Sequence, residues 1–135
     1  MRAVLDANVL VSALLSKAGT PARLVSLWLD AAFDLVVCPA LLAEVERTLA
    51  NPKVRKHIDP ADGESLVRLL RESAELVADP EGEPPLRSED PADDYLLGLA
   101  AREQVPLVSG DKHLLALSDR APVFSPRDFL DRLDG

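Results

Sequence analysis

Acidic side chains stand at several points where the pattern of this chain changes from strand-like to helical. Asp6 interrupts the apolar run MRAVLDANVLVSALL, and Asp111 ends the strand-like stretch VPLVSGD. Three more acids, Asp90, Asp93 and Asp94, lie in DPADDYLL, where a helix is expected to begin. Carboxylates that face one crevice repel one another unless a proton or a cation neutralises them. Because oxygen ligands suit hard ions, the pattern predicts a Mg²⁺ or Mn²⁺ site.

Strands and helices alternate along the chain, so the elements that position these acids can be predicted. Strand-like runs occupy residues 2–6, 34–39, 75–78, 105–111 and 121–124. Helical patterns occupy residues 8–15, 20–33, 40–50, 51–58, 59–74, 92–104, 112–117 and 125–133, with Thr20 as an expected N-cap before Pro21. This alternation predicts an α/β fold with a mainly parallel central sheet flanked by helices. Sites in such folds lie at the carboxyl ends of the strands.

Each acid also has a purely structural explanation. Asp111 is placed to cap the helix KHLLAL, and Asp90 is placed as an N-cap before a proline. Asp93 would complement the dipole of the helix that it begins, and the Asp6 side chain would accept backbone N–H groups of residues 8 and 9. Independent structural explanations for all of them are less attractive together than a shared site.

A further acid is expected from the helix ALLAEVERTLA. Glu44 and Glu46 flank its apolar arc on opposite sides, and a helical wheel does not choose between them. The arc consists of Leu41, Leu42, Val45 and Leu49. For either acid, a solvated helix edge is the alternative.

Length and composition favour one domain, residues 1–135, with an aliphatic core. Apolar residues make up 47% of the chain and aromatic residues only 4%. No stretch approaches the length of a membrane span, and no signal pattern precedes the first strand. The single cysteine, Cys38, fits a reducing compartment and is expected to be a small core residue. We therefore expect a cytoplasmic protein without a membrane partner.

The formal net charge of −8 argues against broad nucleic-acid binding, which usually requires a basic surface. Cations that could contact phosphates are Arg47, the run NPKVRKH and Lys112, although a solvated charged face explains them equally well. A protein with few basic contacts should therefore bind nucleic acid weakly.

Four stretches, in order, resemble the motifs of the PIN-domain nucleases, and most closely the VapC-like toxins of bacterial and archaeal toxin–antitoxin pairs. VLDANVLVSALL resembles the opening strand and helix, with Asp6 in the acidic position. CPALLAEVERTLANPKV resembles the second motif and places the acid of the family on Glu44 rather than Glu46. The likeness runs from residue 1 to about residue 130.

The third and fourth motifs lie in the second half of the chain. DPADDYLLGLAA resembles the third motif, with Asp93 the best-matched metal ligand, Asp94 a near alternative and Asp90 a helper. LVSGDKHLLAL resembles the fourth motif, with Asp111 as the last acid and Ser109 in the small hydroxyl position. Residues 79–91 form a loop that is longer and more acidic than the family pattern leads us to expect before the third motif.

The resemblance implies a PIN-like three-layer sandwich and a Mg²⁺- or Mn²⁺-dependent endoribonuclease. A bound ion would lower the pKa of a water molecule and orient it toward a phosphodiester, while Glu44 or Asp93 helps to remove its proton. Asn8 and Ser109 would support the acids by hydrogen bonds. The implied metal ligands are Asp6, Glu44, Asp93 and Asp111. Implied partners are an RNA substrate and an antitoxin protein, and the helix with Trp28 suggests a homodimer or a core position.

Three other functions are alternatives to this interpretation. A phosphatase with Asp6 as nucleophile would want a second acid at position 8, which is Asn8. A non-catalytic PIN-like module would bind only a protein, and a nuclease outside toxin–antitoxin biology would cut structured RNA or DNA.

Overall fold

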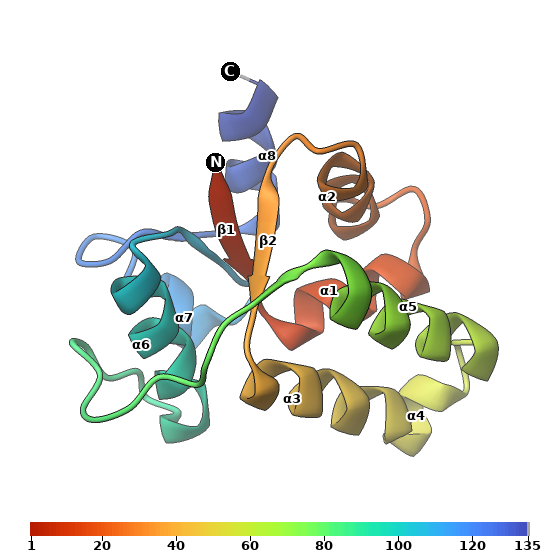
Figure 1. The fold of residues 1–135 in the computed structure, drawn as a ribbon, viewed down its shortest axis with the longest axis horizontal. Coiled ribbons are helices and arrows are strands. Elements are labelled where there is room, and N and C mark those ends of the chain that lie inside the picture. Colours follow the sequence, from red (N-terminus) through yellow and green to blue (C-terminus); the bar gives the residue numbers. More distant parts are fainter. Residues whose placement is uncertain (135) are drawn as a thin grey trace.

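All five strands of the described residues, 1–134, lie in one parallel sheet in the computed structural model (Figure 1). The order is β3-β2-β1-β4-β5, and each neighbouring pair is parallel. The chain therefore builds one half of the sheet outward from β1 and then returns to β1 to build the other half. Its switch point lies between β1 and β4, where ligand sites form in open α/β sheets. The strands are β1 (Arg2–Leu5), β2 (Asp34–Val37), β3 (Glu75–Leu76), β4 (Leu107–Val108) and β5 (Val123–Phe124).

Helices cover both faces of this sheet, as predicted for an α/β fold. Figure 1 shows α1 and α5 on one side of the strands and α6 and α7 on the other. Right-handed crossovers require this arrangement, because the chain reverses its direction across the sheet after β3. The helices are α1 (Ala7–Leu15), α2 (Thr20–Leu29), α3 (Pro39–Ala50), α4 (Pro52–Arg55), α5 (Pro60–Ser73), the 3₁₀ helix η1 (Pro91–Asp93), α6 (Asp94–Glu103), α7 (Lys112–Leu115) and α8 (Pro126–Asp134). None of these helices within residues 1–134 is long and apolar enough to cross a membrane.

The predicted cap of α2 is wrong by one residue. Gly19, rather than Thr20, is the N-cap, and its carbonyl accepts the N–H of Arg23 at 3.1 Å. Because this bond closes the first helical turn, Thr20 is already helical and Pro21 is the second residue of the helix. Gly19 makes no side-chain cap, so the start of α2 depends on backbone geometry that the Thr-Pro signal did not reveal.

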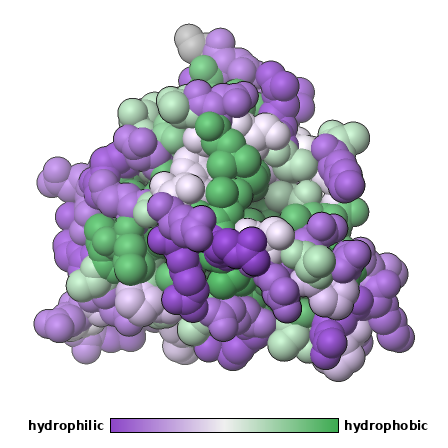
Figure 2. Space-filling view, turned by 45° about the vertical axis from the view of Figure 1, so that its right-hand side comes forward, coloured by the Kyte–Doolittle hydropathy of each residue, from purple (hydrophilic) through white to green (hydrophobic). Residues whose placement is uncertain are grey.

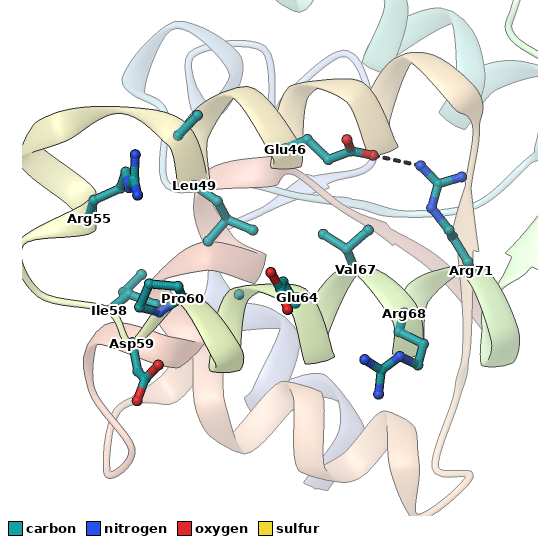
Figure 3. A pocket seen from close by; sticks show the side chains of 12 residues that line it. Glu46, Leu49, Arg55, Ile58, Asp59, Pro60, Glu64, Val67, Arg68 and Arg71 are labelled. Carbon is teal, nitrogen blue, oxygen red and sulfur yellow. Dashed lines mark hydrogen bonds and ion pairs between the residues drawn. The ribbon is translucent and has the colours of Figure 1, made fainter.

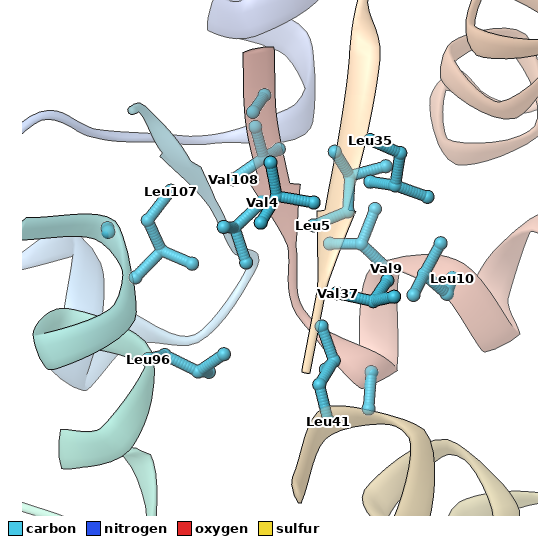
Figure 4. Packing of buried hydrophobic residues seen from close by; sticks show 14 of the residues in the cluster. Val4, Leu5, Val9, Leu10, Leu35, Val37, Leu41, Leu96, Leu107 and Val108 are labelled. Atoms are coloured by element: carbon cyan, nitrogen blue, oxygen red, sulfur yellow. The ribbon is translucent and has the colours of Figure 1, made fainter. Parts of the chain in front are cut away.

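The core is aliphatic, as the composition predicts. Figure 4 shows side chains of β1, β2 and β4 packed between α1 and α3 on one side and α6 on the other. Trp28 is only 6% exposed, which places it in the core rather than at an interface. Cys38 is fully buried, and this burial raises the pKa of its thiol to about 11, so it packs as a small apolar residue.

The acidic loop before α6 is tied to the body of the protein at both ends. Near its start, Asp79 accepts the N–H of Ala40 at 2.8 Å, and Arg102 donates to the carbonyls of Ala78 and Asp79. The predicted loop 79–91 is confirmed except at Pro91, which begins η1. These contacts fix the approach of the chain to α6 and to the acids that α6 carries.

Candidate active site

Asp6 occupies the turn between β1 and α1. It is the N-cap of α1, and its Oδ1 accepts the N–H of Val9 at 2.9 Å. Its Oδ2 accepts the hydroxyl of Ser109, which follows β4. The side chain is 5% exposed. The predicted local role of Asp6 is thus confirmed for the N–H of Val9, and the same carboxylate links the ends of two neighbouring strands.

Ser109 joins the ends of β1 and β4 at the switch point of the sheet. It is fully buried, and while its hydroxyl donates to Asp6, its Oγ accepts the N–H of Asp111 at 3.0 Å. Asp111 caps α7, since its Oδ1 accepts the N–H of His113 at 2.7 Å. Asp111 therefore has both its predicted capping role and a position beside Asp6.

The start of α6 separates the two candidate acids of the third motif. Asp93 is half-buried at the N-cap of α6 without a side-chain cap bond, and its Oδ2 is a buried oxygen with no partner in residues 1–134. Asp94 is 8% exposed and turns elsewhere, because its Oδ1 accepts the N–H of Ser88 at 2.8 Å and its Oδ2 lies 3.7 Å from Arg87. The geometry favours Asp93 over Asp94 as the free acid.

The two remaining supporting candidates are exposed. Asp90 caps η1 by accepting the N–H of Ala92 at 3.0 Å, as predicted from its place before a proline. Its charge also contributes to the raised pKa of Asp93. Asn8 lies in the first turn of α1, and no side-chain hydrogen bond joins it to the acids within residues 1–134.

Helix α3 supplies the fourth acid. Glu44 is half-buried, and its Oε2 accepts the hydroxyl of Tyr95 from α6. Sequence analysis did not single out Tyr95. Burial, followed by this contact with Glu44, raises the pKa of Tyr95, so its hydroxyl is a donor near neutral pH. The only tyrosine of the chain could have served as a signal, but nothing in the sequence indicated its partner.

Glu46 faces a different part of the surface. It is exposed, and its Oε1 lies 2.6 Å from Arg71 of α5. Figure 3 shows this ion pair at the edge of a groove of about 610 Å³ between α3 and α5, whose lining includes Leu49 and Val67. The structure therefore separates the two acids that the helical wheel left equivalent.

The four acids influence one another electrostatically. Burial raises the pKa of Asp6 above its usual range, against its two hydrogen bonds, and the charges of Glu44 and Asp111 raise it further. Burial, contact with Asp111 and the charge of Glu44 contribute to raising the pKa of Asp93 to about 7. Burial by itself would raise the pKa of Asp111. The N–H of His113 and the interaction with Asp93 outweigh burial, so the pKa of Asp111 is lowered. The acids at this edge of the sheet therefore change one another's pKa.

The chemistry of these donors fits a hard divalent cation. They are carboxylate oxygens, and one of them, Oδ2 of Asp93, is buried without a partner in the described part of the chain. Among residues 1–134, however, no three or more Asp, Glu, His or Cys side chains are gathered as a metal cluster. In this structure Asp6 and Glu44 each accept a hydroxyl instead, from Ser109 and from Tyr95.

Replacing Ser109 with alanine should destabilise the protein, because the change leaves Oδ2 of Asp6 and the N–H of Asp111 without their partner. We expect the free energy of unfolding, measured by urea denaturation, to fall by about 1–3 kcal/mol. Ser118→Ala, at an exposed serine, is the matched control and should change it by less than about 0.5 kcal/mol. Equal stability of Ser109→Ala and the wild type would contradict this role.

Comparison with known proteins agrees with the fold. Uncharacterized protein MJ1680 of Methanocaldococcus jannaschii is 23% identical over 145 residues, covering 99% of this chain and 92% of that protein. The structure of PAE2754 from Pyrobaculum aerophilum superposes with a TM-score of 0.66 at 16% identity, over 99% of this chain and 90% of that one. VapBC2 from Rickettsia felis, bound to a DNA fragment from its promoter, gives a TM-score of 0.61 at 13% identity, over 93% and 97%.

At these identities the two solved structures establish a shared fold. The family assignment comes from the sequence, because the sequence model of the PIN domain matches residues 2–113. This range contains the first three motifs and the part of the fourth that holds Ser109 and Asp111. The chain therefore belongs to the PIN-domain nuclease family.

Proposed function

We propose that this chain is a divalent-metal-dependent endoribonuclease that acts as the toxin of a toxin–antitoxin pair. Its PIN-domain sequence supports nuclease activity in general, and its acids support a hydrolytic site. The observation that carries the proposal is the contact through Ser109, which brings Asp6 and Asp111 together where β1 and β4 end. Acids at a sheet switch point are placed where substrates of α/β enzymes bind.

The ligands of the proposed Mg²⁺ or Mn²⁺ ion are Asp6, Glu44, Asp93 and Asp111. When bound, the ion would activate a water molecule and offset the charge that develops on a phosphodiester. Side chains of the protein would transfer protons and hold the acids in place. Asp93, whose pKa is about 7 in the metal-free protein, would lose its proton when the ion binds, and its carboxylate or that of Glu44 would help to remove the proton of the water. Ser109 holds Asp6 and Asp111 in register.

Weak, shape-dependent RNA binding fits the distribution of cations. Lys112 is exposed directly after Asp111 and is placed to meet a phosphate. The run with Lys53, Arg55 and Lys56 is exposed on and just after α4, which follows the far end of α3. With a net charge of −8, the chain should repel nucleic acid that does not reach these cations.

The first experiment compares cleavage of a panel of structured RNAs, and of DNAs of the same sequences, with added Mn²⁺ or EDTA. Glu44→Gln should reduce RNA cleavage about a hundredfold or more, because loss of a ligand removes several kcal/mol of charge stabilisation. Glu46→Gln on the same helix is the matched control and should cut like the wild type, since it disrupts only an exposed ion pair.

Equal loss in the two variants would place the effect in α3 as a whole and contradict the assignment of Glu44. Cleavage of DNA in preference to RNA would show that DNA, rather than RNA, is the substrate. No cleavage and no Mn²⁺ binding would favour a module that binds only protein.

An antitoxin partner is part of this proposal. The Rickettsia felis relative is a VapBC2 complex, and the acidic edge of the sheet here suits a partner that presents a basic side chain. Expression of the wild type should arrest bacterial growth, whereas expression of Glu44→Gln should not.

A homodimer remains a prediction. Figure 2 shows an apolar band through the middle of one face, and sedimentation of the pure protein tests whether it self-associates.

A further inference from the structure

Tyr95 connects two helices that approach the site from different directions. It lies in the first turn of α6, and its hydroxyl donates to Oε2 of Glu44 on α3. Within residues 1–134 no other hydrogen bond reaches the Glu44 carboxylate, and its Oε1 is free. The direction of this carboxylate therefore depends on one donor that is not itself an acid of the site.

The hydroxyl of Tyr95 is held by the way that α6 begins. Asp94, the preceding residue, accepts the N–H of Ser88 at 2.8 Å and thereby fastens the first turn of α6 to the acidic loop. At the other end of the loop, Arg102 donates to the carbonyl of Ala78 at 2.6 Å. Because α6 is anchored at both ends, the ring of Tyr95 cannot easily follow Glu44 if that side chain turns.

The same short segment carries Asp93 and Tyr95, two residues apart. Asp93 is the N-cap of α6, whereas the hydroxyl of Tyr95 donates to Glu44 of α3, so one helix start carries one acid of the site and orients another. A flexible glutamate at the edge of α3 would otherwise sample several rotamers, and ordering it on metal binding would cost conformational entropy. A fixed donor removes part of that cost, as hydrogen bonds to ligating carboxylates do in metal sites generally.

We propose that Tyr95 is a positioning residue, whose hydroxyl holds Oε2 of Glu44 so that Oε1 is presented to a divalent cation. This inference rests on the proposed metal-dependent function and adds a residue to it. Tyr95 itself touches neither metal nor substrate in this role. Its effect should therefore appear in the affinity for the ion rather than in the rate once the ion is bound.

The test is Mn²⁺ affinity, measured from the free Mn²⁺ signal in electron paramagnetic resonance. Tyr95→Phe, which keeps the ring and removes only the hydroxyl, should bind Mn²⁺ about tenfold to a hundredfold more weakly. The Mn²⁺ concentration for half-maximal cleavage should rise equally, with kcat restored at saturation. Thr48→Val is the matched control, because it removes a hydroxyl that donates to the backbone carbonyl of Glu44 at 2.9 Å and should leave Mn²⁺ affinity unchanged.

A double-mutant cycle shows whether Tyr95 acts through Glu44. In a Glu44→Ala background, Tyr95→Phe should have no further effect on Mn²⁺ affinity. Glu44→Asp, which shortens the acid and leaves Tyr95 unchanged, should weaken Mn²⁺ binding and also abolish the effect of Tyr95→Phe. If circular dichroism shows that Tyr95→Phe is unfolded, Glu44→Asp with Tyr95 intact is the remaining test, because the shorter acid gives up the Tyr95 hydroxyl and an unchanged Mn²⁺ affinity would overturn the role.

The possible failures are distinct. If the wild type binds Mn²⁺ and cuts RNA but Tyr95→Phe binds Mn²⁺ equally well, the role of Tyr95 is overturned and the proposed function stands. A loss that persists in the Glu44→Ala background also overturns it, since Tyr95 then acts by another route. If the wild type binds no Mn²⁺, both the role of Tyr95 and the metal-dependent function are overturned.

Discussion

Replacing Asp6 with asparagine is expected to reduce RNA cleavage at least about a hundredfold and, without added metal, to raise the melting temperature. The loss of activity follows from removing a charged ligand at the switch point of the sheet. The gain in stability follows from burial, because this carboxylate is 5% exposed and lies near the charges of Glu44 and Asp111. Asparagine can still accept the N–H of Val9, so the cap of α1 is kept.

The gain in melting temperature of Asp6→Asn should increase with pH. The pKa of Asp6 is raised in the folded protein, so the folded protein binds this proton more tightly than the unfolded chain does. The stability that this group contributes is therefore present at low pH and is lost as pH rises through its folded-state pKa. The melting temperature of Asp6→Asn should exceed that of the wild type most at pH 8, and the difference should shrink on acidification.

Asp59→Asn is the control for the capping role. Asp59 caps α5 through the N–H of Ala61 at 2.9 Å and lies on the exposed surface. This variant should leave cleavage unchanged, because Asp59 caps a helix that carries none of the four acids. The shared-site assignment would be wrong if Asp6→Asn lowered the melting temperature in metal-free buffer and still cut RNA.

The position of Asp6 was predictable because it depends on a general rule. Parallel strands end at one edge of a sheet, so acids after β1 and β4 meet if these strands are neighbours. The predicted strands 2–6 and 105–111 were nevertheless too long, since the acids themselves end the strand-like runs by capping α1 and α7. The structural explanations of Asp6 and Asp111 are also confirmed, and their role as metal ligands stays a prediction.

The choice between Glu44 and Glu46 could not come from helical periodicity, because both residues flank the same apolar arc. It depends on what lies across from each acid, which is Tyr95 of α6 in one case and Arg71 of α5 in the other. Contacts between helices distant in sequence leave no local pattern. Tyr95 was missed for the same reason.

The second large effect concerns the neighbouring acids Asp93 and Asp94, compared as alanine variants at the start of α6. Asp93→Ala should lose Mn²⁺ binding and RNA cleavage, while its stability in metal-free buffer at pH 8 should equal or exceed that of the wild type. Asp94→Ala should weaken Mn²⁺ binding far less than Asp93→Ala does, but it should lose about 1–3 kcal/mol in free energy of unfolding, because the N–H of Ser88 loses its acceptor. Urea denaturation and Mn²⁺ titration separate the two roles.

The raised pKa of Asp93 also predicts how the affinity for Mn²⁺ changes with pH. Burial and contact with Asp111 raise the pKa of Asp93 to about 7, so the free protein holds a proton there below that pH. A carboxylate must lose its proton to bind a metal ion, so Mn²⁺ affinity should rise with pH until about 7 and then level off, with proton release on binding. The stability that protonated Asp93 contributes should be lost over the same range as pH rises. Retained Mn²⁺ binding in Asp93→Ala, together with its loss in Asp94→Ala, would exchange the two assignments.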